Sequence, residues 1–253
     1  MVTVVIIGFG NVGSHLYQVF EATPGIEVLQ VYARSIPMEI IPSKKITTNI
    51  KNIVDHADVY IAAVPDDTIN AITAQLPFTN KFVVHTSGGA ALKSSSDINR
   101  RGVFYPLQTF SKNKAIDFKV IPICVEAENE DDLTLLIKIG RHISKKVTII
   151  STVERAKIHV AAVFVNNFVN ELYHISEDIL KKQQLDFGLL TPLIKETAQK
   201  IEYLTPALAQ TGPAKRGDEK TMLRHQDLLT EQQQKVYHLL TKSIQKRNKS
   251  QDE

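Results

Sequence analysis

Three glycines near the start of the chain have the spacing of a phosphate-binding turn. The segment reads "IIGFGNVGSHL", with glycines at Gly8, Gly10 and Gly13. They follow a β-branched run and open a segment with helical spacing, which is the context of a dinucleotide-binding turn. Gly8 would permit the tight turn, Gly10 would let a pyrophosphate approach the backbone, and Gly13 would let the helix pack close to the strand. The alternative is a plain strand-to-helix turn.

We expect the phosphates to lie at the N-terminal end of that helix, where free N–H groups and the helix dipole favour negative charge. The residues assigned to the turn are Gly8, Phe9, Gly10, Asn11, Val12 and Gly13.

The end of the next predicted strand indicates which dinucleotide binds. NAD-binding chains place Asp or Glu about 20 residues after the glycines. This chain reads "VYARS" there, with Arg34 and Ser35 and no acid. A guanidinium and a hydroxyl can hold a 2′-phosphate, which a carboxylate would repel. We therefore expect NADP, and the alternative is a surface arginine at a strand end.

A later strand ends in residues that would line the same site. "ADVYIAAVPDDTI" ends a predicted strand with Ala63, Val64 and Pro65. Ligands of open α/β sheets lie beyond such strand ends. Asp66 and Asp67 are interpreted as caps of the following helix rather than as chemical groups.

The segment "HTSGG" ends another predicted strand on the cofactor side. Thr86 and Ser87 are assigned to the cofactor, and Ser87 and Gly88 also to the substrate. His85 is interpreted as a hydrogen-bonded strand-end residue rather than a reacting group. "YPLQTF" is expected to form pocket wall, and within it Gln108 is assigned to the substrate.

The helix predicted from residue 153 carries polar residues on an otherwise apolar segment. On a 100° wheel His159, Asn166, Asn170 and Glu177 lie within about 20° of one line, and Asn167 lies about 80° away. Such a polar stripe needs partners. We expect His159 and Asn167 to be catalytic, with His159 as proton donor to a carbonyl or imine. The alternative is a polar network between helices or subunits.

The segment "TGPAKRGDEKTMLRH" predicts a turn-rich loop between two helices. Gly212 and Gly217 allow the chain to fold sharply, and Asp218 suits an N-cap. Arg216 could clamp a substrate carboxylate or phosphate with two hydrogen bonds. Gly212 and Arg216 are therefore assigned to the substrate, and the alternative is a connecting loop.

These residues need a sheet and helices to position them. Apolar runs predict strands at 2–7, 26–35, 58–65, 82–89, 102–110, 120–128 and 146–151. Helical spacing predicts helices at 13–22, 129–143, 153–183, 186–204, 218–230 and 231–246. Strands alternating with helices predict an α/β, Rossmann-type, doubly wound parallel sheet, followed by an all-α C-terminal domain. We place the domains at 1–151 and 152–253.

Composition excludes several other classes. The 253 residues are 43% hydrophobic, with a single cysteine and a net charge of +3. The chain shows no signal peptide or membrane span, no metal-ligand spacing and no nucleic-acid pattern stronger than a basic tail. We expect a cytoplasmic protein without metal, membrane or nucleic-acid partners, acting as a homodimer on a small-molecule substrate.

The motifs "GFGNVG", "YARS", "DVYIAAVPDDTI" and "HTSGG" resemble the superfamily of 6-phosphogluconate dehydrogenase, ketopantoate reductase and pyrroline-5-carboxylate reductase. Four further segments, "HTSGG", "FYPLQTF", "HVAAVFVNNF" and "TGPAKRGDEKTMLRH", resemble a narrower family of NADP oxidoreductases. That family joins a Rossmann-like N-terminal domain to a C-terminal helical domain of formerly unknown function. The resemblance covers nearly the whole chain, implies the fold and NADP, and supports His159 and Asn167.

The chain departs from its better-known relatives. Hydroxyacid dehydrogenases carry a Lys and an Asn about one turn apart, whereas Lys157 precedes Asn167 by ten positions. The Gly-Gly-Thr-Thr segment of pyrroline-5-carboxylate reductases has no match. The sequence predicts hydride transfer between NADP(H) and a small carbonyl, hydroxy or imine metabolite. The alternative is a catalytically silent nucleotide sensor or partner-binding protein.

Overall fold

A computed structural model describes residues 1–35, 41–112 and 114–249. The chain divides into two compact units, Met1–Asn166 and Asn167–Glu253. Within the described residues the strands all belong to the first unit. They are β1 (Val2–Ile7), β2 (Ile26–Tyr32), β3 (Ile46–Thr47), β4 (Val59–Ala62), β5 (Phe82–His85), β6 (Arg100–Pro106), β7 (Ile123–Ala127) and β8 (Val147–Ile149).

The strands form one sheet in the order β3-β2-β1-β4-β5-β6-β7-β8. The first six positions have the 3-2-1-4-5-6 order of Rossmann sheets, and neighbours among them are parallel. The predicted fold class is confirmed. One pair departs from it, because β7 runs antiparallel to β6. Parallel neighbours usually need a helical crossover, and the described residues between 107 and 122 contain only the short helix η5 (Phe118–Val120).

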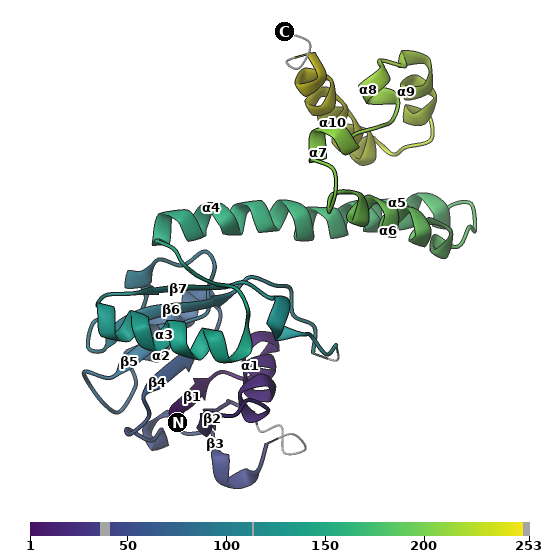
Figure 1. Ribbon diagram of the computed structural model, residues 1–253. Coiled ribbons are helices and arrows are strands. Elements are labelled where there is room, and N and C mark those ends of the chain that lie inside the picture. Colours follow the sequence, from purple (N-terminus) through teal and green to yellow (C-terminus); the bar gives the residue numbers. More distant parts are fainter. Residues whose placement is uncertain (36–40, 113, 250–253) are drawn as a thin grey trace. The chain divides into compact units, whose positions relative to one another are not determined.

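Helices cover both faces of this sheet (Figure 1). In the first unit they are α1 (Asn11–Glu21), α2 (Ile69–Thr73), α3 (Glu130–Ile143) and α4 (Thr152–Val163). Short helical turns are η1 (Ser43–Lys45), η2 (Ile50–Asn52), η3 (Asp66–Thr68), η4 (Leu92–Ser94) and η5. The π-helical segment η6 (Phe164–Phe168) continues α4.

The second unit is helical throughout its described residues. Its helices are α5 (Val169–Lys181), η7 (Phe187–Leu190), α6 (Thr191–Lys200), α7 (Pro206–Ala209), α8 (Pro213–Arg216), α9 (Glu219–Gln226) and α10 (Glu231–Lys249). No described helix combines the length and the apolar character that a membrane crossing needs.

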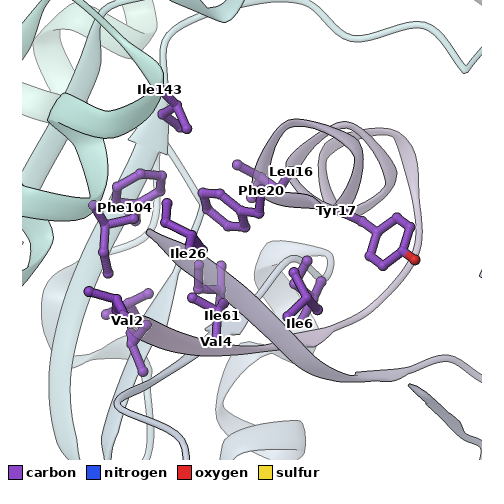
Figure 2. Close-up of a cluster of buried hydrophobic side chains, with 14 of the residues drawn as sticks. Val2, Val4, Ile6, Leu16, Tyr17, Phe20, Ile26, Ile61, Phe104 and Ile143 are labelled. Atoms are coloured by element: carbon purple, nitrogen blue, oxygen red, sulfur yellow. The ribbon is translucent and has the colours of Figure 1, made fainter. Parts of the chain in front are cut away.

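The core explains the continuous apolar run of β1. Val4 and Ile6 pack into a larger cluster with side chains of α1 and α3, part of which Figure 2 shows. Val5 and Ile7 pack into a smaller cluster. Its other side chains include ones from η2, from β4, from α2 and from the segment after α2. Successive side chains of a strand point to opposite faces, so β1 is buried on both. The carboxyl end of β1 is therefore held firmly where the glycine turn begins.

The first unit extends beyond the predicted domain border at residue 151. It includes α4, because Arg155 and His159 on that helix contact residues of the sheet. The division into domains at 151 and 152 stays a prediction.

The segment η6 changes the predicted polar stripe. A π-helical turn holds one residue more than an α-helical turn, so positions beyond it lag by about 100° on the wheel. Asn166 and Asn167 lie inside this segment. A wheel of 100° per residue does not describe the segment, because the sequence does not reveal the extra residue, and the assignment of Asn167 stays a prediction.

Candidate functional site

The turn between β1 and α1 requires glycine at two positions. Gly8 has a φ of 98°, and a Cβ there would lie 2.4 Å from the carbonyl oxygen of Ala63. A Cβ at Gly13 would lie 2.1 Å from the carbonyl oxygen of Gly8. Real Cβ atoms do not approach so closely. Gly8 and Gly13 thus permit the tight turn and the close packing of helix against strand.

Gly10 is neither strained nor crowded by the protein. Its φ of −79° and ψ of −160° suit any residue, and nothing lies within 4 Å of the position that a Cβ would take. Gly10 is the N-cap of α1, and its helix has no side-chain cap. The first turn of α1 thus has no side-chain cap, and the position beside Gly10 is open, which fits an anionic group such as a dinucleotide pyrophosphate.

The glycine turn lies between the ends of β2 and β4. Backbone hydrogen bonds of 2.8 Å join the N–H of Gly8 to Tyr32 and the N–H of Ala63 to Ile7. This is the point where the strand order reverses on either side of β1. Ligands of open α/β sheets bind in the crevice at such a point.

The residues that follow these strands lie at the same edge. Arg34 and Ser35 come after β2 and are exposed, as a group that contacts a ligand must be. Val64 and Pro65 follow β4, and Pro65 is the N-cap of η3. Asp66 and Asp67 occupy the first turn of η3, where carboxylates are favoured.

The loop after β5 is held by its own hydrogen bonds. The N–H of Ser87 donates to Nδ1 of the fully buried His85 at 3.2 Å, and Nε2 donates to the carbonyl of Ala91 at 3.1 Å. Burial is the main cause that lowers the pKa of His85 to about 4, so the ring is neutral at neutral pH. The Ser87 hydroxyl accepts from the N–H groups of Gly89 and Ala90. These bonds agree with the interpretation of His85 as a strand-end residue.

Arg155 of α4 ties this loop to β7. It is 1% exposed, and its guanidinium donates to Glu126 Oε2 at 2.6 Å, to the carbonyl of Ala90 at 2.5 Å and to that of Ser87 at 3.3 Å. Glu126 also accepts from the N–H and hydroxyl of Thr152. Burial lowers the pKa of Arg155, and Glu126 opposes that shift. The network positions the backbone of the loop that carries Thr86, Ser87 and Gly88.

A capping box fixes the start of α4. The Ser151 hydroxyl accepts from the N–H of Glu154, and the Glu154 carboxylate accepts from the N–H of Ser151 at 2.8 Å. The Ser151 hydroxyl also donates to the Glu154 carboxylate, and the two bonds that this carboxylate accepts, from the hydroxyl and from the N–H of Ser151, lower the pKa of Glu154. The box sets the phase of the helix and so the directions of Arg155 and His159.

His159 meets Tyr105 of β6 above the two glycines of the loop. The Tyr105 hydroxyl and His159 Nδ1 are 3.3 Å apart, and the rings pack edge to face. A Cβ on Gly88 would lie 2.6 Å from both His159 Nδ1 and Tyr105 Cζ. A Cβ on Gly89 would lie 3.5 Å from Asp66 Oδ2 and 3.8 Å from His159 Nε2. The ends of β4, β5 and β6 and helix α4 thus bring five polar or glycine residues together.

The sequence also assigned residues in other parts of the chain. Gln108 is exposed after β6, and its side chain accepts from the N–H of Thr109. Asn167, Gly212 and Arg216 belong to the second unit. Asp218 caps α9 as predicted, since its carboxylate accepts from the N–H of Thr221. Among the residues that the structure describes, no group of three or more His, Cys, Asp or Glu could hold a metal ion.

Comparison with known proteins identifies the family. The model described as "Domain of unknown function (DUF2520)" matches residues 121–244. The crystal structure of a candidate NADP oxidoreductase from Bacteroides fragilis is 33% identical, with 97% of this chain and 98% of that chain covered and a TM-score of 0.86. The chain therefore carries a DUF2520 domain and belongs to the same family as this Bacteroides fragilis protein. No curated protein matches it.

Two further solved structures share the fold of this DUF2520 protein. A Thermotoga maritima protein is 24% identical, with 99% of this chain and all of that chain covered (100%) and a TM-score of 0.75. A reductive aminase from Aspergillus terreus, in complex with NADPH and ethyl levulinate, is 12% identical with a TM-score of 0.68. That likeness covers 97% of this chain and 94% of that chain.

Sequence reasoning missed three features of this DUF2520 site. Arg155 was not singled out, because a buried arginine and a surface arginine look alike in a helical segment. The Ser151-x-x-Glu154 pattern, which is a legible capping-box signal, would have fixed the helix start. Tyr105 was assigned to pocket wall, since nothing in the sequence shows that it meets His159, 54 residues away.

Proposed function

We propose that this DUF2520 protein is an NADPH-dependent oxidoreductase acting on a small carbonyl, hydroxy or imine compound. The open position at Gly10, at the sheet's switch point, carries the proposal because it fits a pyrophosphate. The Bacteroides fragilis relative is described as a candidate NADP oxidoreductase, and the Aspergillus terreus structure contains NADPH.

In this proposal the six residues from Gly8 to Gly13 hold the pyrophosphate by backbone N–H groups. Arg34 and Ser35 bind the 2′-phosphate, and the assigned residues after β4 and β5 line the rest of the cofactor. When bound, the nicotinamide supplies or accepts the hydride. His159 donates a hydrogen bond from its ring N–H to the carbonyl oxygen or imine nitrogen, and the proton that completes the reduction comes from water.

We expect NADPH to bind more tightly than NADH by about ten- to a hundred-fold, which corresponds to one charge-assisted contact of about 1.5–3 kcal/mol. Arg34→Ala should remove most of that difference while leaving NADH affinity unchanged. Calorimetric titration of both proteins with both cofactors measures it. Equal dissociation constants for the unmutated protein would contradict the assignment of Arg34.

The reaction is tested by NADPH oxidation with a panel of small keto acids, aldehydes and cyclic imines. We expect turnover with at least one of them. His159→Asn should lower kcat by about 10²- to 10³-fold, as the loss of one hydrogen-bond donor to the reacting group does, with NADPH affinity retained. His56→Asn, at an exposed histidine of the same unit, is the matched control. NADPH binding without turnover on the whole panel would favour a nucleotide sensor instead.

The remaining assignments stay predictions. Asn167 as a catalytic residue, Gly212 and Arg216 as a clamp for a substrate anion, and Gln108 as a substrate contact are proposed from the sequence. A cytoplasmic homodimer is proposed as well. The second unit supports the dimer with large exposed apolar side chains, which a partner surface commonly covers, at Leu189, Leu193, Leu208, Leu223, Leu228 and Leu239.

A further inference from the structure

The contact between Tyr105 and His159 has a direction that the surroundings determine. Tyr105 is 9% exposed. Among the described residues its hydroxyl makes a single hydrogen bond, the one to His159 Nδ1 at 3.3 Å. Burial raises the pKa of Tyr105 above its ordinary value, so the phenol keeps its proton at neutral pH. A buried hydroxyl proton needs an acceptor, and Nδ1 of the neutral imidazole is the acceptor in reach.

A neutral imidazole that accepts at Nδ1 carries its proton on Nε2. The Nε2 edge of His159 lies beside Gly89, where a Cβ would be an ordinary 3.5 Å from Cδ2 and 3.8 Å from Nε2. His159 is only partly buried, in contrast to Tyr105. The Nδ1 edge thus faces Tyr105 and Gly88, and the Nε2 edge faces Gly89.

Gly88 makes the contact sterically possible. A Cβ at Gly88 would lie 2.6 Å from His159 Nδ1 and 2.8 Å from the Tyr105 hydroxyl oxygen. Either ring would have to move if this residue had a side chain. The charged side chains that act on Tyr105 are Arg155, which pairs with Glu126, and Asp66, whose Oδ2 would lie 3.5 Å from a Cβ on Gly89.

We propose that Tyr105 is a positioning residue whose hydroxyl fixes the tautomer of His159 and thereby presents Nε2–H to the substrate. This assignment rests on the proposed function for its substrate, a carbonyl or imine that accepts a hydrogen bond. It concerns a hydrogen bond and moves no proton. The ring polarises the C=O or C=N group, with its Nδ1 edge held by Tyr105 and its Nε2 edge on the side of Gly89.

Nitrogen-15 NMR of the histidine rings tests the tautomer without any substrate. At pH 8, where an ordinary histidine is neutral, His159 should show a protonated Nε2 and an unprotonated, hydrogen-bonded Nδ1. The signals of His159 are assigned by their absence from His159→Gln. In Tyr105→Phe the Nδ1 signal should move to the position of a nitrogen without a hydrogen bond. A protonated Nδ1 in the unmutated protein, or a His159 spectrum unchanged in Tyr105→Phe, would overturn the proposal.

Three variants serve as controls for this measurement. Tyr60→Phe removes another buried tyrosine hydroxyl, which accepts from the N–H of Ala57, and should leave the His159 signals unchanged. Gly88→Ala should shift them, whereas Gly89→Ala, at a position with ordinary contact distances, should not. Equal spectra for the two alanine variants would contradict the steric argument, and Tyr105→Phe decides if Gly88→Ala does not fold.

The activity readout separates this inference from the proposed function. With a reducible substrate, Tyr105→Phe should lower kcat about two- to ten-fold, the value of one hydrogen bond, at unchanged NADPH affinity. If no substrate is reduced, the proposed function is contradicted. The tautomer of His159 is still decided by the NMR spectrum, which needs no substrate.

Discussion

Arg155→Met is expected to lower the free energy of unfolding by about 3–5 kcal/mol, the usual loss when one partner of a buried ion pair is removed. The guanidinium is 1% exposed and makes three hydrogen bonds, to Glu126, Ser87 and Ala90. Methionine fills much of the same volume but leaves the Glu126 carboxylate without its cation. It also leaves two carbonyl groups of the loop unpaired. Urea denaturation of the two proteins measures the difference.

Arg101→Met is the matched control for this prediction. Arg101 also binds a carboxylate, that of Glu128, but both side chains are partly exposed. Pairs accessible to water contribute about 0–1 kcal/mol. If both arginine variants lower the free energy of unfolding by the same amount, the burial of Arg155 does not make its ion pair more important for stability than an exposed one.

Much of the first unit could be predicted from local patterns. The apolar run of β1 is continuous because both faces of that strand are buried, so this burial can be predicted from the run itself. The glycines predict the turn because two of its positions, Gly8 and Gly13, have no room for a Cβ. Each of these patterns is local, because the residues that form it also form the structure that it predicts.

The parts that were missed depend on contacts between distant residues or on a local irregularity. The antiparallel β7 follows from the absence of a crossover helix before it, a weak signal in an irregular stretch. The extra residue of η6 has no sequence marker in "FVNNF", so a regular helical wheel could not account for it. Arg155 and Tyr105 owe their roles to partners 29 and 54 residues away, Glu126 and His159.

Gly10→Ala is expected to abolish tight NADPH binding and to leave the fold intact. The φ and ψ of Gly10 suit alanine, and no atom lies within 4 Å of the added Cβ. Exchange of glycine for alanine at an N-cap costs well under about 2 kcal/mol. The methyl group would, however, occupy the space that the proposed pyrophosphate needs. Loss of two charge-assisted hydrogen bonds, of about 1.5–3 kcal/mol each, weakens binding about a hundred-fold or more.

Gly13→Ala is the comparison variant, because it should lower the stability of the protein, whereas Gly10→Ala should leave the fold intact. Its Cβ would lie 2.1 Å from the carbonyl oxygen of Gly8, so α1 must move away from β1 and the protein must lose stability. Urea denaturation should therefore separate the two variants before any cofactor is added, and calorimetric titration with NADPH should show weak binding for both. If Gly10→Ala binds NADPH as the unmutated protein does, the open space at Gly10 is not the pyrophosphate site. The turn is then a tight connection between β1 and α1, because Gly8 and Gly13 satisfy the sterics of the fold without any ligand.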